Sequence, residues 1–250
     1  MEITPTSEMS ARSSGLALLL DDGTRKSHSV AENTQFVTGF FKGISTKSSF
    51  SQLVSSLYFV YEGMERAFEV STDESVKALD YPELRRLETL AMDMEYYFGS
   101  DWRSRVKPSP ATKKYVGRIE EIAEREPHLL VAHMYTRYLG DLFGGQMMGG
   151  MARSSLKLDE GFGTKFYEFS DIQDTKAFIE GWYEKLNALD LTEEQERAVV
   201  DEGNLVFALN IDLFNELEGG KRVVFKTVWK LVKDGLTSRW RGKQRAEFGS

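Results

Sequence analysis

The sequence predicts an all-α fold in a single domain. Apolar residues recur at helical spacing through most of the 250 residues, and no segment shows the alternation typical of a half-buried strand. We find no repeat with a period of roughly 20–50 residues, which argues against a solenoid or a propeller. The chain divides into a disordered segment over 1–12, a helical domain over 13–240 and a polar tail over 241–250.

Composition excludes several functional classes. A net charge of −7 argues against broad nucleic-acid binding, which needs a basic surface. The absence of cysteine excludes disulfides, thiolate catalysis and cysteine-ligated metal sites. No apolar run approaches the roughly 20 residues of a membrane span. The apolar share of 41% is typical of a soluble globular protein with a sizeable core.

The first half of the chain shows helical spacing in several consecutive segments. We expect helices over 13–33, 35–42, 48–70, 82–98 and 111–125. Pro82 suits the first turn of its helix, where the missing N–H would have no partner in any case. A loop containing Trp102, Pro108 and Pro110 precedes the last of these helices.

The second half begins with a long helix that Pro127 opens. We expect a loop over 159–164 and then helices over 174–187, 193–217 and 221–240. The segment 190–193 suits a cap between the first two of these three helices. Gly219 and Gly220 are expected to end the penultimate helix.

The glycine-rich stretch 129–150, LLVAHMYTRYLGDLFGGQMMGG, is the most unusual part of the sequence. Five glycines lie inside its helical pattern, and each costs about 1 kcal/mol of helix stability relative to alanine. Gly140 and Gly144 are four residues apart and therefore share one face, beside the ionisable Asp141. Three interpretations stay open on spacing alone: close helix packing, a helix break, or a bare face for a large planar ligand.

His28 is the second candidate, because Asp21, Arg25 and Glu32 share its helix face. Glu32 can accept a hydrogen bond from one imidazole nitrogen and leave the other nitrogen free as a ligand. The alternative is an ordinary surface pair. His133 is better explained as a core histidine with a satisfied hydrogen bond, and no histidine-cluster, phosphate-loop or nucleophile motif is present.

Two stretches carry a family resemblance, TRKSHSVAEN at 24–33 and LLVAHMYTRYLGDLFGGQ at 129–146. The sequence resembles the haem oxygenases, and its residues in these stretches are more similar to those of the soluble bacterial, cyanobacterial and algal members than to those of the membrane-anchored animal members. The similarity extends over about residues 15–220 and includes SLYFVY at 56–61, FYEFSDI at 166–172 and ALNIDLFNELEG at 208–219. It implies an all-α fold with haem between a proximal helix and a kinked, glycine-rich distal helix.

The resemblance also implies roles for single residues. His28 becomes the axial iron ligand, with Glu32 as its hydrogen-bond partner. Asp141 would hold an ordered water that supplies a proton during the reaction. Tyr61, Arg137 and Asn210 are expected to help Asp141, and Gly140, Gly144 and Gly145 would let the distal backbone approach the macrocycle. The other expected haem contacts are Arg25, Tyr135, Phe207 and Phe214.

The implied function is a monooxygenase reaction in which haem b is both cofactor and substrate. Dioxygen and external electrons open the ring to biliverdin IX-alpha and release carbon monoxide and ferrous iron. Expected partners are ferredoxin or another electron donor and a downstream bilin reductase. We expect a monomer in the plastid stroma or the bacterial cytoplasm. The alternatives are a non-catalytic haem-binding or haem-delivery relative and, less favoured, a helical bundle that acts on another small molecule.

The sequence departs from the family pattern where the haem propionates are usually bound. Asp21, Ile179 and Tyr183 stand at positions that are commonly basic, and Lys176 or Lys185 could substitute. Losing several exposed pairs of about 0–1 kcal/mol each would weaken haem binding by roughly one or two orders of magnitude. Phe143 and the Gly149-Gly150 pair are also unusual and would loosen the distal side. Candidates for a basic patch that receives an acidic ferredoxin are Arg85, Arg86, Arg103, Arg105, Lys107, Lys113 and Lys114.

Overall fold

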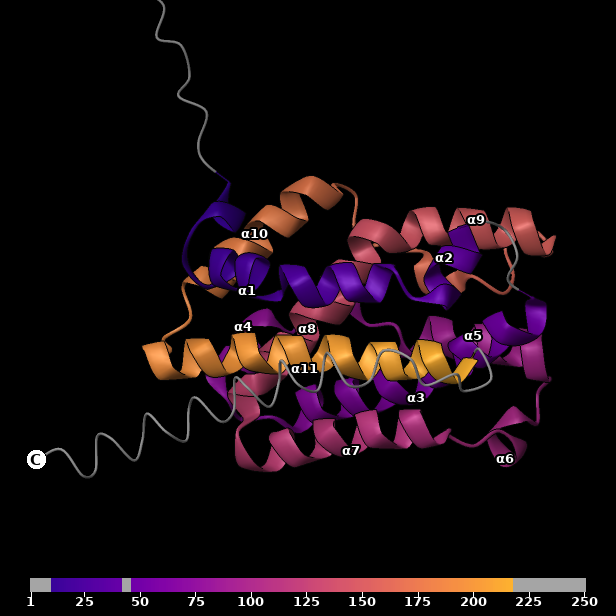
Figure 1. Cartoon of the computed structure of the whole chain (residues 1–250), viewed down its shortest axis with the longest axis horizontal. Helices are drawn as coiled ribbons and strands as arrows, with labels where there is room; N and C mark the ends of the chain where they lie inside the picture. The colour runs from indigo at the N-terminus through magenta and orange to yellow at the C-terminus, as the bar shows by residue number, and fades with distance from the viewer. Residues whose placement is uncertain (1–9, 42–45, 218–250) are drawn as a thin grey trace, which may run out of the picture.

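The computed structural model confirms the all-α prediction. It describes residues 10–41 and 46–217, and within these ranges the chain forms helices and turns and no strand (Figure 1). The predicted helix over 221–240, the glycine pair before it and the polar tail lie outside the described residues.

The helices agree with the predicted segments in six places, each to within two residues. The α-helices of the described residues are α1 Gly15–Glu32, α2 Gln35–Phe41, α3 Lys47–Val70, α4 Glu74–Leu79, α5 Leu87–Phe98, α6 Trp102–Arg105, α7 Pro110–Arg125, α8 Leu130–Met134, α9 Gln146–Leu156, α10 Thr175–Asn187 and α11 Glu193–Leu217. The confirmed predictions are those for α1, α2, α3, α7, α10 and α11.

The helix predicted to begin at Pro82 begins later. Pro82–Leu84 forms a separate 3-10 turn, and α5 starts at Leu87. The physical reason is a cap supplied by α3: Glu65 Oε1 accepts hydrogen bonds from the backbone N–H groups of Arg86 at 2.6 Å and Leu87 at 3.2 Å. These donors would otherwise lack partners at the start of a helix.

Two short helices were not predicted. Asp73 caps α4 by accepting hydrogen bonds from Ser75 N at 2.9 Å and Val76 N at 3.2 Å. The segment predicted as a loop around Trp102 contains α6, whose tryptophan is 2% exposed and packs edge-on against Tyr58. Helices this short depend on tertiary contacts more than on their own sequence.

The segment predicted to be disordered is ordered in its last residues. Ala11–Ser13 forms a 3-10 turn ahead of α1. Asn187 of α10 binds both sides of this turn, because its Nδ2 donates to Ala11 O at 2.7 Å and its Oδ1 accepts from Ala17 N at 2.9 Å. The correction concerns residues 10–12, since the preceding residues lie outside the described chain.

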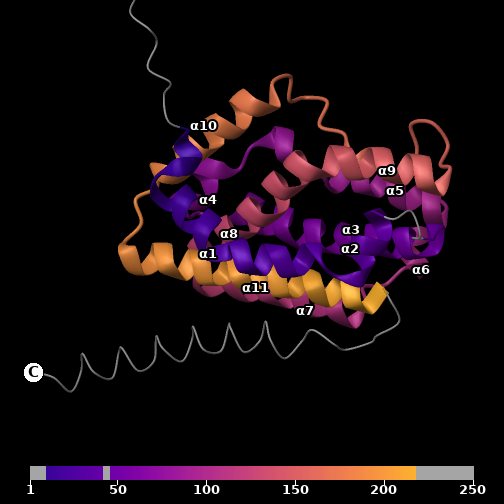
Figure 2. The same ribbon diagram turned by 45° about the horizontal axis from the view of Figure 1, so that its top comes forward.

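Helices α1 and α11 run side by side in both views (Figures 1 and 2). A Cβ at Gly23 would lie 2.4 Å from Val200 Cγ1, and one at Gly203 would lie 3.1 Å from Thr24 Cγ2. Glycines are therefore needed at both positions for the two backbones to come this close. The close approach sets the position of α1 on α11.

The largest fully buried side chains of the core are mainly aromatic and come from several helices. They include Trp182, Tyr61, Tyr115, Tyr138, Phe50 and Phe166.

None of the helices in the described part of the chain is long and apolar enough to cross a membrane.

Candidate functional site

His28 lies on α1 with its ring held by α11. The ring contacts Phe207 edge-on, with 5.4 Å between the ring centroids and 88° between the planes. One residue earlier, Ser27 Oγ donates a hydrogen bond to Asn204 Oδ1 at 2.5 Å. The two contacts fix the orientation of His28 on a close-packed helix pair, while 56% of its side chain stays exposed.

The predicted pairing of His28 with Glu32 is present as an electrostatic contact. The imidazole Nδ1 lies 3.6 Å from Glu32 Oε2, which is too long for a direct hydrogen bond. Nε2 makes no hydrogen bond with any of the residues that the structure describes. The geometry leaves one nitrogen facing a carboxylate and the other available, which is the arrangement common for a metal-bound histidine.

The glycine-rich stretch forms the irregular centre of the distal helix. Between α8 and α9, the segments Tyr135–Leu139 and Asp141–Gly145 are π-helical, and Gly140 separates them. π-Helical turns are rare and concentrate at functional sites. The predicted break therefore takes the form of two widened turns inside a helical path that runs through to Leu156.

The glycines of the distal helix fall into two groups. A Cβ at Gly140 or Gly144 would meet no atom within 4 Å, so these two form a bare face. A Cβ at Gly145 would lie 2.7 Å from Tyr167 Cδ1, and one at Gly149 would lie 2.9 Å from Tyr167 Cβ. The structure shows that Gly145 packs against Tyr167, and the predicted contact of its backbone with haem stays a prediction.

Alanine substitutions should separate these two groups. Gly144→Ala is expected to stabilise the ligand-free protein by up to about 1 kcal/mol, because alanine favours the helix and nothing blocks its Cβ. Gly145→Ala is expected to destabilise it by roughly 1–3 kcal/mol, because the Cβ overlaps Tyr167. Urea denaturation of both variants tests this. Equal stability of the two variants would contradict the assignment.

Four of the predicted catalytic side chains meet beside this bare face. The Tyr61 hydroxyl of α3 donates a hydrogen bond to Asp141 Oδ2. Arg137 Nη2 donates to the same oxygen at 3.0 Å, and Arg137 Nη1 donates to Asn210 Oδ1 of α11 at 2.9 Å. The side chains of Asp141 and Arg137 are only 13% and 10% exposed. The structure therefore brings Asp141, Tyr61, Arg137 and Asn210 together as predicted.

The environment controls the protonation of this cluster. Burial raises the pKa of Asp141, and the charge of Arg137 opposes the rise without cancelling it. Burial and the charge of Asp141 raise the pKa of Tyr61 well above its usual value, so the phenol stays a hydrogen-bond donor. Burial lowers the pKa of Arg137, but Asp141 and the neighbouring phenols of Tyr61 and Tyr115 together outweigh burial and keep the pKa above its usual value. Asp141 is thus the group of this cluster best suited to exchange a proton.

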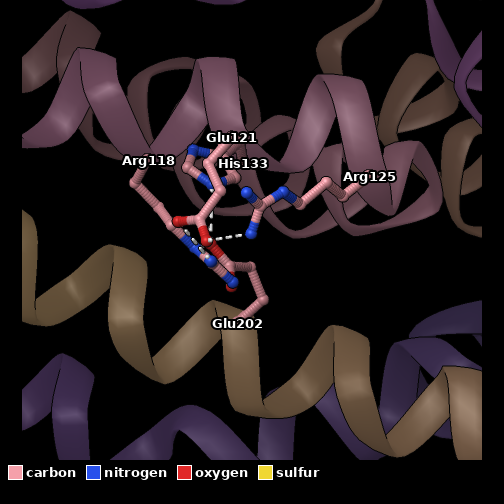
Figure 3. A network of polar contacts seen from close by, with 5 residues as sticks. All are labelled: Arg118, Glu121, Arg125, His133 and Glu202. Atoms are coloured by element: carbon pink, nitrogen blue, oxygen red, sulfur yellow. Dashed lines mark hydrogen bonds and ion pairs between the residues drawn. The ribbon is translucent and has the colours of Figure 1, made fainter.

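A second buried polar network lies nearer the start of the distal helix, on the amino-terminal side of Asp141 (Figure 3). His133 Nε2 is 3.1 Å from Glu202 Oε1, and Arg118 Nη2 donates to Glu202 Oε2 at 2.6 Å. Arg118 also donates to Glu121 at 2.9 Å, on the side toward solvent. The prediction that His133 is a core histidine is confirmed, because its side chain is fully buried and its Nε2 pairs with Glu202. Only one ring nitrogen is satisfied, since Nδ1 has no hydrogen-bond partner among the described residues.

Four buried polar atoms have no hydrogen-bond partner among the described residues. They are Tyr115 Oη, His133 Nδ1, Thr136 Oγ1 and Arg137 Nε. Buried polar atoms of this kind are normally satisfied by ordered water. Sequence reasoning missed Tyr115 and Thr136, because neither belongs to a local motif and both are buried only by the packing of helices.

Comparison with known proteins agrees with this arrangement. The sequence matches the protein family described as "Heme oxygenase" over residues 14–216, which includes both His28 and the Asp141 cluster. The chain belongs to the haem oxygenase family. It is 44% identical to "Heme oxygenase 1" of Synechocystis sp. over 94% of this chain and 96% of the relative. It is 45% identical to "Heme oxygenase" of Porphyra purpurea over 82% of this chain and 87% of the relative.

A solved structure shows the same fold. The crystal structure of haem oxygenase-1 from Synechocystis sp. in complex with haem matches with a TM-score of 0.80 at 44% identity, covering 89% of this chain and all of that one. The comparisons support an enzyme of the haem oxygenase family rather than a non-catalytic haem carrier. Electrons from a donor are a general requirement of haem oxygenases.

The donor set of this chain fits haem. One imidazole nitrogen without a partner on α1 suits an axial iron ligand, and a helix face without side chains at Gly140 and Gly144 suits a flat macrocycle. Phe207, which we predicted as a haem contact, touches the His28 ring.

The other predicted haem contacts make contacts within the protein, and their roles toward haem stay predictions. Phe214 stacks on Phe36 of α2, with 5.6 Å between the ring centroids and 9° between the planes, so its position is explained by packing of α11 against α2. Arg25 is 71% exposed and pairs with Asp22 at 2.5 Å. Tyr135 lies half-buried, and burial raises its pKa above the usual range.

The unusual residues of α10 are part of the core. Ile179 is 5% exposed and Tyr183 is 3% exposed, so both fill space where the family pattern has surface bases. Lys176 and Lys185 are exposed, and neither makes an ion pair in the described structure. The two α10 positions that we expected to lack a basic side chain for haem propionates therefore hold buried core residues in the structure.

Proposed function

We propose that this haem oxygenase opens haem b to biliverdin IX-alpha and releases carbon monoxide and ferrous iron. The observation that carries the proposal is the buried cluster of Asp141, Tyr61 and Arg137 beside the bare helix face at Gly140 and Gly144. A haem-binding protein without turnover has no need of a buried carboxylate held by two donors at this place.

Each residue has a separate task in this proposal. Bound haem supplies the iron that activates dioxygen and the ring edge that is oxidised. His28 holds the iron through the nitrogen that does not face Glu32. Gly140 and Gly144 let the distal backbone lie close to the ring, which restricts the space above the iron. Asp141 holds a water molecule and passes a proton through it.

The supporting residues keep Asp141 in this role. Arg137 is anchored by Asn210 and lies one helical turn before Asp141, so it fixes the carboxylate against rotation. Tyr61 of α3 donates to the same carboxylate oxygen of Asp141 as Arg137 Nη2 does. Two buried polar atoms without a partner among the described residues lie at this cluster, Arg137 Nε and Tyr115 Oη, and each of them can bind an ordered water.

An absorption time course tests the proposal. The purified protein receives one equivalent of ferric haem under air and then ferredoxin with its reductase. We expect a Soret band that forms and then decays into a biliverdin spectrum, and chromatography of the product identifies the isomer. A stable Soret band would contradict turnover. A His28→Ala variant that gives the same Soret band would contradict His28 as the iron ligand.

We further propose that ferredoxin is the electron donor and that a bilin reductase takes the product. The chain would act as a monomer in the bacterial cytoplasm or the plastid stroma, a placement supported by its cyanobacterial and algal relatives. Arg86 cannot be part of the basic patch expected to receive ferredoxin, because it is 5% exposed. Its side chain donates to the backbone carbonyls of Glu83, Leu84 and Glu168. Ion pairs already engage three other candidates, namely Arg85, Arg105 and Lys114.

Charge reversal at the remaining exposed bases tests the ferredoxin site. Arg103→Glu combined with Lys107→Glu should slow ferredoxin-driven turnover by about tenfold at low salt, because an acidic partner loses electrostatic attraction. Turnover driven by ascorbate should not change. Stopped-flow measurements at two ionic strengths give both rates. Equal slowing with both reductants would contradict a docking role.

A further inference from the structure

The structure places one arginine from the start of the chain at the mouth of the haem site. Arg12 belongs to the 3-10 turn Ala11–Ser13, ahead of α1. Its Nη2 lies 2.5 Å from Asp21 Oδ1 on α1, and its Cζ lies 6.0 Å from the ring centroid of Phe143 on the distal helix. Arg12 therefore spans the proximal and the distal sides of the site.

The turn that carries Arg12 is fixed to α10. Glu180 accepts hydrogen bonds from Ala11 N and, at 2.8 Å, from Ser10 Oγ. Asn187, two turns farther along α10, donates to Ala11 O at 2.7 Å. These hydrogen bonds fix the backbone of the turn on α10, and the fixed backbone holds the Arg12 guanidinium close to Asp21 and Phe143.

The guanidinium retains capacity for a second carboxylate. Asp21 contacts only Nη2, so Nε and Nη1 have no hydrogen-bond partner among the described residues. An arginine offers five N–H donors and can serve two carboxylates at once. Arg12 lies near the phenols of Tyr135 and Tyr183: burial raises the pKa of both phenols, and the positive charge of Arg12 opposes this rise.

The other bases near the mouth are poorly placed for this task. Arg25 on α1 points to Asp22 at 2.5 Å and Asp21 at 3.6 Å and is 71% exposed. The α10 positions Ile179 and Tyr183 are uncharged and buried. Half of the Arg12 side chain is accessible to solvent, with 49% exposed, which leaves it open to a ligand at the mouth.

We propose that Arg12 binds a propionate carboxylate of haem and so sets the rotation of the ring in the pocket. The inference rests on the proposed function, since it needs haem held by His28. In this arrangement Asp21 holds the guanidinium in place before haem arrives, and the propionate binds to the N–H groups that Asp21 does not use. An amino-terminal turn would thus do the work of side chains that α1 and α10 lack.

Titration with two ligands tests the inference. Ferric haem and its dimethyl ester, in which both propionates are neutral, are titrated separately by Soret absorbance into the full chain. Arg12→Gln should weaken haem binding three- to tenfold and change ester binding by less than twofold, because only the charged ligand loses an ion pair. The difference should shrink at high salt. Arg12→Lys should recover part of the loss. Arg25→Gln tests the rival position on α1, and Arg66→Gln, which removes another exposed arginine paired with a carboxylate, is the matched control.

The outcomes are distinct. An unchanged haem affinity of Arg12→Gln, or an equal loss for haem and ester, would overturn the propionate role. A larger loss in Arg25→Gln than in Arg12→Gln, seen only with the charged ligand, would also overturn it and assign the role to α1. If the wild-type protein gives no Soret shift with either ligand, the proposed function fails as well, which separates that failure from the failure of Arg12 alone.

Discussion

Replacing Asp141 with asparagine is expected to slow ring opening by about two to four orders of magnitude while haem still binds. The amide keeps the shape of the carboxylate and can still accept the hydrogen bonds from Tyr61 and Arg137. It cannot release and recover a proton as the carboxyl does. Single-turnover absorbance with preformed haem complex measures the rate of ring opening, and the Soret titration measures binding separately.

Tyr61→Phe provides a graded control for this experiment. It removes one donor to Asp141 and leaves the Arg137 contact at 3.0 Å, so the rate should fall by less than about tenfold. Wild-type ring opening by Asp141→Asn would show that another group handles the proton. A loss of the Soret band in the same variant would instead show that Asp141 supports the fold of the pocket, since the buried Arg137 would have lost its counter-charge.

The long helices were predictable because their apolar spacing is strong and their ends carry local signals. The two short helices were not, since α6 exists through the burial of Trp102 and not through its own propensity. The start of α5 depended on Glu65, a residue of α3 whose carboxylate caps α5 from 21 residues earlier in the chain. A cap from another helix leaves no local trace in the sequence.

The site was predictable only where the sequence resembles that of the haem oxygenases. His28 and the Asp141 cluster follow from matching stretches, and the structure brings the cluster together. The difference between the bare glycines and the glycines packed against Tyr167 was not predictable, because residue spacing does not show which face of the distal helix lies against Tyr167. Arg12 was also missed, since nine positions separate it from Asp21 and only the attachment of its turn to α10 brings the two together.

Glu202→Leu is expected to reduce the free energy of unfolding by about 3–5 kcal/mol at neutral pH. Glu202 is 3% exposed and is the acceptor for both His133 at 3.1 Å and Arg118 at 2.6 Å. Leucine would leave His133 Nε2 and the Nε and Nη2 groups of Arg118 without this acceptor, while Arg118 Nη1 keeps Glu121. Removing one partner of a buried pair has a cost of this size. For a chain of this length, thermal unfolding should shift downward by roughly 6–15 °C, which calorimetry can measure.

A matched variant on the surface separates burial from charge. Glu121 contacts the same Arg118 at 2.9 Å, but its side chain is 47% exposed. Glu121→Gln should therefore cost less than about 1 kcal/mol, as exposed pairs do. Similar losses in both variants would show that Arg118 and not the burial of Glu202 decides the stability of this region.

The pH dependence supplies an independent check, and it follows from the direction of one pKa shift. Burial raises the pKa of Glu202, but the hydrogen bonds from His133 and Arg118 outweigh it, so the pKa lies below its usual value. A carboxyl with a depressed pKa in the folded state stabilises the protein above its unfolded pKa of about 4.3 and loses this contribution as the pH falls through the folded value. The difference in stability between wild type and Glu202→Gln should therefore be constant above about pH 5 and shrink toward pH 3, because the glutamine does not titrate. A difference that grows as the pH falls would mean that the ion pairs in Figure 3 do not hold Glu202 in its charged form.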